Sequence, residues 1–427
     1  MNEADDGVGS EQPRSLAPFV IIWTGQALSL VGSSLVQFSL VWWLTEASGS
    51  ATVLAMATMM EVLPRIFIGP FAGALVDRWN RRVVMLISDA LIALALLVLA
   101  ILYTMDAVQI WHIYIVMFLR ATGGAFHWPA MQASTTLMVP AKHLTRVAGM
   151  NQTLQGIVNV VAPPLGALLY ELLPMQGIIA IDVGTACLAI GPLLAVSIPQ
   201  PRREVIGGEA ESQHSVLADL REGLSFVWSW PGLVILLIVA AVSNLLGNPA
   251  FSLVPLLVSE HFGGDALELG WFQAAFGFGV IAGALTLSIW GGFRRRIITV
   301  AVASVLGGVG FIMIGLAPAQ AILMAVGIAF FVGFFNPIVN GSLMAMLQVA
   351  IPPEMQGRVF TLILSITGLT TPLGLLMAGP TADALGVPAW FVISGIVIVI
   401  MSAGQLLFPA IRQIEQPRSE VSGIAGV

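Results

Sequence analysis

Charged residues are scarce in this sequence, and lysine is almost absent. Only 9% of the 427 residues are Asp, Glu, Lys or Arg, and Lys142 is the single lysine. A soluble globular domain carries about a quarter charged residues, so the composition excludes a soluble protein. The formal net charge of −6 provides no basic surface for a nucleic acid, and we expect no nucleic-acid partner.

The sequence has a single cysteine and lacks the common motifs of nucleotide-binding, metal-binding and nucleophile sites. Cys187 is the single cysteine, so no disulfide framework is possible. A P-loop requires Gly-Lys followed by Ser or Thr, whereas Lys142 follows Ala141, which excludes ATP-driven transport by this chain. The sequence has no Cys/His cluster with metal-ligand spacing and no nucleophile elbow. We therefore expect no enzyme, no cofactor and no metal site.

Long apolar runs are what the sequence has in quantity. Hydrophobic residues make up 57% of the chain, and runs of 20 or more residues can cross the roughly 30 Å hydrocarbon core as helices. Strands of a membrane barrel would instead alternate over about ten residues. We predict an all-α membrane protein with twelve spans: 18–44, 51–76, 83–104, 109–138, 147–171, 176–198, 228–258, 268–291, 297–317, 320–350, 358–381 and 387–410.

The basic residues predict the orientation of these spans. Fifteen of the seventeen lie in loops on one side or in the two tails: Arg14, Arg78, Arg81, Arg82, Lys142, Arg146, Arg202, Arg203, Arg221, Arg294, Arg295, Arg296, Arg358, Arg412 and Arg418. By the positive-inside rule both termini are cytoplasmic and the protein lies in the cell membrane. The acidic first 17 residues are unlike a signal peptide, so we expect the first span to be retained.

The chain divides into two similar halves. We predict a tail at 1–17, a six-helix bundle at 18–198, a linker at 199–227, a second bundle at 228–410 and a tail at 411–427. Gly32, Pro129, Arg146 and Pro164-Leu-Gly recur as Gly247, Pro337, Arg358 and Pro372-Leu-Gly, at offsets of 208 to 215 residues. Parallel repeats of this kind are typical of transporters that rock two bundles around a central site.

Four stretches resemble the major facilitator superfamily, in the branch of macrolide efflux pumps and the enterobactin exporter. They are "WTGQALSLVGSSLVQFSLVWWLTEASGSAT", "LPRIFIGPFAGALVDRWNRR", "VPAKHLTRVAGMNQT" and "IPPEMQGRVF". The superfamily signature G-x-L-x-D-R-x-G-R-R is present as Gly73, Leu75, Asp77, Arg78, Arg81 and Arg82. Asn80 replaces its glycine, and Asn tolerates a left-handed turn. The resemblance implies twelve helices in two pseudo-symmetric six-helix bundles, and we expect a monomer.

The signature also implies a conformational latch made of Gly73, Asp77, Arg78 and Arg81. Small residues at Gly69, Ala72 and Gly73 would let the second span approach a neighbouring helix. Asp77 would then face the positive N-terminus of another helix and pair with Arg81. Alternatively, Arg78 and Arg82 serve only to orient the chain in the membrane. The second half has the arginines of residues 294–296 but no matching acid.

Five charged residues fall inside predicted spans, and charge at membrane depth indicates function. All are in the first half: Glu61, Arg65, Asp89, Arg120 and Asp182. We expect Asp89 to reach Arg65 or the Arg81 cluster and Asp182 to have no basic residue at its level. Three acids outnumber two arginines, so one carboxylate remains to take up a proton. Arg120 resembles the arginine of the family's fourth span, which supports proton transfer. Two alternatives to proton coupling stay open. Glu61 and Arg65 could form a static ion pair within one helix, and Asp182 could reach the outer lipid headgroups.

Amides and aromatic residues are candidates for the wall of a substrate cavity. These are Gln37, Trp42, Phe126, His127, Asn244, Asn248, Phe251, Phe335, Asn336 and Asn340. A lining with little fixed charge suits bulky amphipathic molecules, although hydrogen bonds between helices would also account for the amides. We predict a proton-coupled exporter of a drug, macrolide-like compound or siderophore. The alternatives are a lipid or lysophospholipid translocator without obligatory proton coupling and a non-transporting membrane sensor or partner.

Overall fold

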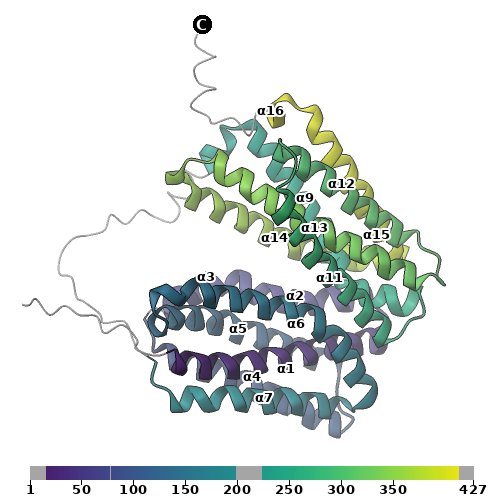
Figure 1. Ribbon diagram of the computed structural model, residues 1–427. Coiled ribbons are helices and arrows are strands. Elements are labelled where there is room, and N and C mark those ends of the chain that lie inside the picture. Colours follow the sequence, from purple (N-terminus) through teal and green to yellow (C-terminus); the bar gives the residue numbers. More distant parts are fainter. Residues whose placement is uncertain (1–15, 77, 199–223, 413–427) are drawn as a thin grey trace, which may run out of the picture. The chain divides into compact units, whose positions relative to one another are not determined.

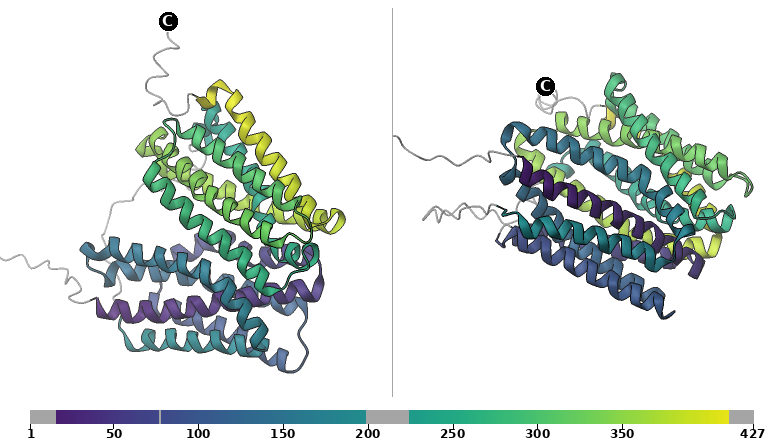
Figure 2. Two further views of the ribbon diagram at one scale, coloured as in Figure 1. Left: turned by 45° about the vertical axis from the view of Figure 1, so that its right-hand side comes forward. Right: turned by 60° about the horizontal axis from the view of Figure 1, so that its bottom comes forward.

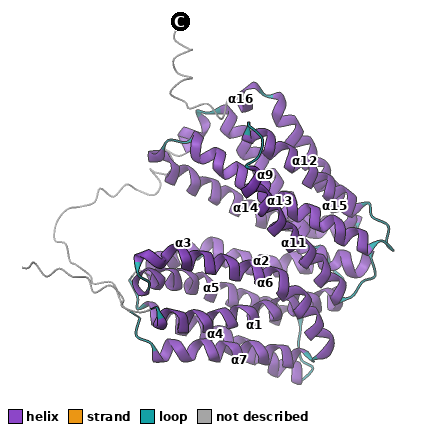
Figure 3. Ribbon diagram, viewed as in Figure 1, coloured by secondary structure: helices purple, strands orange, loops and turns teal. Residues whose placement is uncertain are grey.

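The computed structural model describes residues 16–76, 78–198 and 224–412, and in these ranges the chain is helical without any strand (Figure 3). The helices of the first half are α1 (Ala17–Ser48), α2 (Ala51–Phe67), α3 (Gly69–Val76), α4 (Arg81–Thr104), α5 (Ile110–Met138), α6 (Leu144–Leu172) and α7 (Met175–Ala195). A 3-10 turn at Ala141–His143 precedes α6. The all-α prediction is confirmed.

The helices of the second half are α9 (Pro231–Ser252), α10 (Val254–Leu256), α11 (Ala266–Trp290), α12 (Arg296–Gly315), α13 (Ile322–Ala350), α14 (Pro353–Leu385), α15 (Val387–Gly404) and α16 (Pro409–Arg412). A π-helical turn at Leu257–His261 follows α10, and a 3-10 turn at Gln405–Leu407 follows α15. In the described part of the chain, ten helices are long and apolar enough to cross a membrane, and each coincides with a predicted span. The predicted spans 51–76 and 109–138 are also helical but are not among the ten.

The predicted second span is interrupted between α2 and α3. Pro70 lacks a backbone N–H, and its ring clashes with the carbonyl of the preceding turn. Hydrogen bonds nevertheless continue on either side of the break, from the Ile68 amide to Pro64 and from the Ala72 amide to Ile68, each 2.8 Å long. Among the described residues nothing lies within 4 Å of a Cβ built on Gly69 or Gly73. The role of these two glycines in close helix packing therefore stays a prediction, whereas Ala72 between them is fully buried.

Asn80 has a different role from the expected left-handed turn. Its φ of −69° and ψ of 110° are extended, and its side chain accepts hydrogen bonds from the amides of Arg82 and Val83. Asn80 is thus the N-cap of α4, a position at which Asn is favoured because its oxygen satisfies free amides of the first turn.

The repeat between the halves is visible in matching arginine contacts. Arg81 donates a hydrogen bond to the carbonyl of Ala133 on α5 at 2.8 Å, and Arg296 donates one to the carbonyl of Ala345 on α13 at 3.0 Å. The two donors are 215 positions apart and the two acceptors 212, within the offset found in the sequence. Each arginine binds the last turns of a neighbouring helix, where the helix dipole favours a cation.

The chain forms two compact units, which we describe separately. Unit 1 contains residues 16–37, 63–158 and 173–198 among those described. In it α4 packs against α5 and α7, and Figures 1 and 2 show α7 running beside α4 and α1. Its core includes Phe19, Ile22, Met85, Ala130 and Leu193. Arg81 and Arg82 are the first residues of α4, and Arg82 contacts the last turns of α7; we call this the basic end of unit 1.

Unit 2 contains residues 38–62, 159–172 and 224–412 among those described. In it α13 packs against α11 and α12, α12 against α15, and α9 against α14. The helices α11 and α13 are so close that a Cβ on Gly283 would lie 1.9 Å from the carbonyl oxygen of Phe334. The last turns of α1 and α6 and the first turns of α2 also belong to this unit. We call the end at which α2 begins and α14 finishes the acidic end of unit 2.

Candidate functional site

Two glycines of α1 bring α7 close enough to place a carboxylate beside α1. A Cβ on Gly25 would lie 3.0 Å from the carbonyl oxygen of Leu188. A Cβ on Gly32 would lie 2.3 Å from Oγ1 of Thr185 and 3.1 Å from Oδ1 of Asp182. The backbones can therefore approach only because these positions lack a side chain, and Asp182 is the polar residue that this approach brings to α1.

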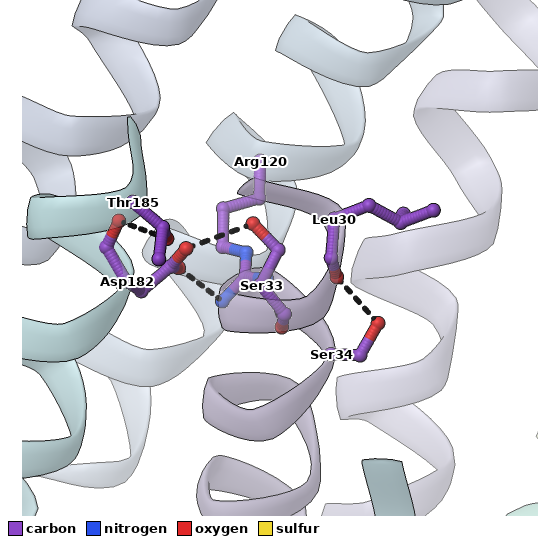
Figure 4. A network of polar contacts seen from close by, with 6 residues as sticks. All are labelled: Leu30, Ser33, Ser34, Arg120, Asp182 and Thr185. Carbon is purple, nitrogen blue, oxygen red and sulfur yellow. Dashed lines mark hydrogen bonds and ion pairs between the residues drawn. The ribbon is translucent and has the colours of Figure 1, made fainter. Parts of the chain in front are cut away.

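Asp182 lies in a network that joins α1, α5 and α7 (Figure 4). Its Oδ1 accepts a hydrogen bond of 3.0 Å from the Ser33 hydroxyl, and its Oδ2 lies 4.0 Å from Nη1 of Arg120. Nη2 of Arg120 donates to the backbone carbonyl of Ser33 at 2.7 Å, and the Thr185 hydroxyl donates to the backbone carbonyl of Asp182 at 2.9 Å. Asp182 is only 1% exposed. The prediction that it has no basic partner is therefore wrong, because Arg120 reaches its level from α5.

Asp89 forms a second buried cluster with α1 and α5. Its Oδ2 accepts a hydrogen bond of 3.1 Å from the Gln26 amide, and its Oδ1 lies 3.5 Å from Nε2 of His127. Asp89 is 8% exposed. The contacts of Asp89 differ from the expected ones to Arg65 or the Arg81 cluster, because it faces an amide and an imidazole, and the expectation is corrected accordingly.

The two clusters lie at successive levels along α1 and α5; we call each level a tier and the two together the ladder. Ser33 and Arg120 belong to one tier, and Gln26 and His127 belong to the other. On α1 and on α5 the two members are seven residues apart, which places them on the same helix face about 10 Å apart along the axis. Asp182 and Asp89 are thus the carboxylates of successive levels, with the Asp89 level nearer the basic end of unit 1.

Five polar residues of α1, α6 and α7 contribute contacts that the sequence analysis did not single out. They are Trp23, Gln26, Ser33, Asn151 and Thr185; Trp23 donates its indole hydrogen bond to Asn151 at 2.7 Å. Uncharged polar residues do not stand out in a search for charge at membrane depth. A signal was nevertheless present, since Gly25-Gln26 and Gly32-Ser33 repeat on α1 at a spacing of seven.

The other predicted proton-coupling residues, Glu61 and Arg65, lie one turn apart on α2. Glu61 is half-buried and Arg65 is exposed. Their role stays a prediction, as does the latch, since Asp77 lies outside the described residues. Of the other latch residues, Arg78 is exposed and Arg81 is buried against Ala133. The Arg82 guanidinium donates to the carbonyls of Leu193 and Leu194 in the last turns of α7, which fits the anchoring role.

The predicted cavity residues divide into packed and more open groups. Trp42 is 2% exposed, Phe126 stacks on Trp79 with ring centroids 6.2 Å apart, and His127 belongs to the Asp89 tier. Gln37 is half-buried near the middle of α1. Phe335 packs edge-on against Phe334. Their role as the wall of a cavity stays a prediction.

The amides of the second half bind one another within unit 2. Nδ2 of Asn248 donates to Oδ1 of Asn244 at 3.1 Å and lies 3.0 Å from the Thr371 hydroxyl on α14. Asn340 donates to the backbone of Asn336, one turn earlier on α13. Asn248 and Asn340 are exposed.

A small aromatic pocket lies beside these amides in unit 2. Its cavity volume is only about 10 Å³, the space of about one water molecule, and it is lined by five phenylalanines, Phe251, Phe272, Phe276, Phe311 and Phe391, with aliphatic residues between them. The rings of Phe251 and Phe276 meet edge to face with centroids 4.8 Å apart, an arrangement that aromatic pairs favour. Phe251 is the most exposed of the five phenylalanines.

Comparison with known proteins identifies one family and similar relatives. The family model described as Major Facilitator Superfamily matches residues 22–369 and 236–424. The chain is 35% identical to macrolide efflux protein A of Streptococcus pyogenes over 399 residues, which cover 93% of this chain and 96% of that protein. It is 30% identical to the multidrug efflux pump Tap of Mycolicibacterium fortuitum over 413 residues, which cover 93% of this chain and 97% of the pump.

Solved transporter structures have a similar fold. A bacterial homologue of the human lysosomal transporter Spinster, in an inward-facing and unoccupied conformation, covers 95% of this chain and 98% of its own with a TM-score of 0.70 at 15% identity. A mutant of the nucleoside transporter NupG covers 89% and 99% with a TM-score of 0.64 at 13% identity. At these identities the similarity concerns the fold alone.

Proposed function

Since this chain belongs to the Major Facilitator Superfamily, we propose that it is a secondary active transporter that exports hydrophobic or amphipathic small molecules in exchange for protons. It is a multi-pass membrane transporter rather than an enzyme. The relatives named for macrolide and multidrug efflux support export of bulky drug-like compounds. Coupling to protons rests on the residues of this chain.

One observation carries the coupling: the buried carboxylate of Asp182 lies 4.0 Å from the Arg120 guanidinium and accepts one hydroxyl hydrogen bond. A structural ion pair usually gains close, often bidentate contacts, whereas this carboxylate has one hydrogen bond from Ser33 and a guanidinium at the limit of an ion pair. Both protonation states are therefore accommodated. The anion is attracted to Arg120, and the neutral acid keeps its hydrogen bond because a serine hydroxyl both donates and accepts.

Protonation of Asp182 changes which helices attract one another. Arg120 has a second acceptor, the Ser33 carbonyl at 2.7 Å, so its guanidinium stays bound to α1 when the carboxylate becomes neutral. The attraction between α5 and α7 is then lost, whereas the contact between α5 and α1 remains. We infer that binding and release of the proton shift α7 relative to α5 and so bias alternating access.

Asp89 provides a second position for the proton, nearer the basic end of unit 1. Gln26 and His127 contact its two carboxylate oxygens, and an imidazole ring can both bind and release a proton. The ladder thus offers two carboxylates about 10 Å apart along α1 and α5. We propose that Asp182 is the coupling acid and that Asp89 with His127 exchanges the proton with the basic end. That end is cytoplasmic in the orientation that the arginines favour.

The second half supplies an uncharged surface for the substrate. Asn244 and Asn248 on α9 and Asn336 and Asn340 on α13 exchange hydrogen bonds with polar groups of a ligand, and the ring of Phe251 contacts its apolar part. An aromatic and amide surface binds amphipathic molecules of varied shape because few of its contacts depend on a fixed charge.

The decisive experiment uses proteoliposomes with an acidic interior. A labelled macrolide and a fluorescent lipophilic cation are added outside, and their accumulation is followed for the wild type, Asp182→Asn and Asp106→Asn. Asp106 is a loop carboxylate with a φ of 51°, where Asn is well tolerated, so its variant is a matched control. We expect accumulation by the wild type and the control and none by Asp182→Asn, which still exchanges labelled for unlabelled substrate without a gradient.

Two results would contradict the proposal. Full gradient-driven accumulation by both Asp182→Asn and Asp89→Asn would show that the ladder does not couple protons. Movement of a fluorescent lysophospholipid without any dependence on the gradient, with neither drug transported, would instead identify a lipid translocator.

A further inference from the structure

One carboxylate of the second half binds the start of a first-half helix within unit 2. Asp383, in the last turn of α14, accepts hydrogen bonds from the backbone amides of Ala51 at 2.6 Å and Thr52 at 3.1 Å. It also accepts one from the Thr52 hydroxyl at 2.5 Å and one from the Ser50 hydroxyl at 3.1 Å. Four donors from the short segment Ser50–Thr52 at the start of α2 thus converge on a single side chain more than 300 residues away.

These contacts complete the N-terminus of α2. The first turn of a helix has amides without a partner inside the helix, and here Asp383 takes those of Ala51 and Thr52. The Val53 amide turns to the Ser50 hydroxyl at a longer 3.4 Å, and the Leu54 amide makes the first regular helical bond to Ser50 at 3.3 Å. A side chain of α14 therefore supplements the local cap that Ser50 provides.

Gly379 brings the two helices together one turn before Asp383. Residues 379 and 383 lie on the same face of α14. A Cβ on Gly379 would lie 2.8 Å from Cα of Thr52 and 3.3 Å from Cβ of Ala55. Any larger residue would separate α14 from α2. Gly379 therefore permits the close approach of the two helices, and Asp383 binds the free amides in the first turn of α2.

Asp383 is poorly placed for its own helix. The last turn of a helix carries partial negative charge, so an acid there is unfavourable, whereas the same acid is favourable at the first turn of α2. Asp383 is also exposed, so water replaces its hydrogen bonds at modest cost when the helices separate. The hydrogen bonds between Asp383 and the first turn of α2 are directional and charge-assisted. Because they are also open to water, they can break and form again.

We propose that Asp383 is a positioning residue for transport, which caps α2 to hold the acidic end of unit 2 closed in one state of the transport cycle and releases α2 when the passage opens there. This inference rests on the proposed alternating access, but not on the identity of the substrate or on proton coupling. In the expected orientation this is the outer end, opposite to the latch predicted around Asp77.

The first experiment measures the conformational equilibrium without any substrate. A cysteine at the buried position 55 is introduced into a Cys187→Ser background, and its reaction with a membrane-impermeant maleimide is timed. Removing the cap with Asp383→Asn, or forcing the helices apart with Gly379→Ala, is expected to raise the labelling rate about tenfold. Asp383→Glu restores the charge and is expected to restore part of the protection.

Two controls separate a gate from a loss of folding. Asp265 caps its own helix α11, with hydrogen bonds to the amides of Leu267 and Glu268, so Asp265→Asn alters a carboxylate cap without touching α2 and should leave the labelling unchanged. A cysteine at the exposed position 316 should react equally in every variant. Equal labelling of position 55 with and without Asp383 would overturn the proposal.

The second experiment locks the junction. In the same background, Ser50→Cys/Asp383→Cys is treated with a short reducible bifunctional thiol cross-linker, and substrate exchange without a gradient is measured. We expect cross-linking to stop exchange and reduction to restore it, because the acidic end must open. Undiminished exchange by the cross-linked protein would show a permanent contact and overturn the proposal. A loss of gradient-driven accumulation with exchange intact would instead point to the proton-coupling residues.

Discussion

The two halves share a repeated pattern of helices but differ in where they place charge. The first half has Asp89, Arg120 and Asp182 buried between its helices. In the described part of the second half, charged residues such as Glu260, Asp265, Arg296 and Asp383 lie at or near helix ends, and the middle carries amides and phenylalanines. The difference suggests a division of tasks, with proton binding in the first half and substrate contact in the second.

Removal of Arg120 is expected to disturb this division most. Arg120→Leu leaves the Asp182 carboxylate buried without its cation, and breaking a buried pair costs about 3 kcal/mol or more. We expect a large fall in the unfolding temperature in detergent and a loss of gradient-driven accumulation. The double variant Arg120→Leu/Asp182→Asn removes both charges and is expected to regain stability but not accumulation. If the double variant were as unstable as the single one, the pair would not be what holds α5 near α7.

Gly32→Ala is expected to weaken the same network through packing. The added Cβ meets Oγ1 of Thr185 and comes within 3.2 Å of Cα of Asp182, so α7 moves away from α1 and the Ser33–Asp182 hydrogen bond lengthens. Overpacking of this kind costs about 1–3 kcal/mol. Gly184→Ala on the facing helix α7 is the control, since no described atom lies within 4 Å of its built Cβ. Equal unfolding temperatures for the two variants would contradict the close approach of α1 and α7.

Much of the fold was predictable from the sequence because apolar length and arginine placement are strong signals. The partners of the buried charges were not, because counting residues gives depth along a helix but not which faces meet. Asp182 was assigned no basic partner for this reason, although Arg120 lies on α5 beside it. Asp383 was missed because the predicted span ended at 381, whereas α14 continues to Leu385. Gly73 matched a motif, yet its packing could not be inferred from the motif alone.

Phe251→Ala tests whether the second half contacts the substrate, and its expected effect is smaller. Its ring contacts Phe276 and Phe311 at the open side of the aromatic pocket, so its loss removes apolar contact with the substrate. We expect KM for a macrolide to rise about three- to tenfold, while the pH dependence of transport stays that of the wild type. A changed pH profile would place proton coupling in both halves and remove the distinction. Phe331→Ala, at an exposed position outside the pocket lining, is the control.

Asp265→Ala is expected to have the smallest effect, because this carboxylate serves only its own helix. Its hydrogen bond with Glu268 and those with backbone amides hold the pKa of Asp265 below its ordinary value. A lowered pKa in the folded state stabilises the protein above the pKa of the unfolded state, near 4, and that contribution is lost as the pH falls through the folded value. Since Asp265 is exposed and screened by solvent, the loss at pH 7 should not exceed the roughly 1 kcal/mol of an N-cap. Thermal unfolding of wild type and variant between pH 7 and 3 should therefore converge towards acid, with transport at pH 7 unchanged. If Asp265→Ala exported substrate markedly more slowly than the wild type, a helix cap that contacts no other helix would also act on the transport cycle. The contrast between Asp265 and Asp383 would then be lost.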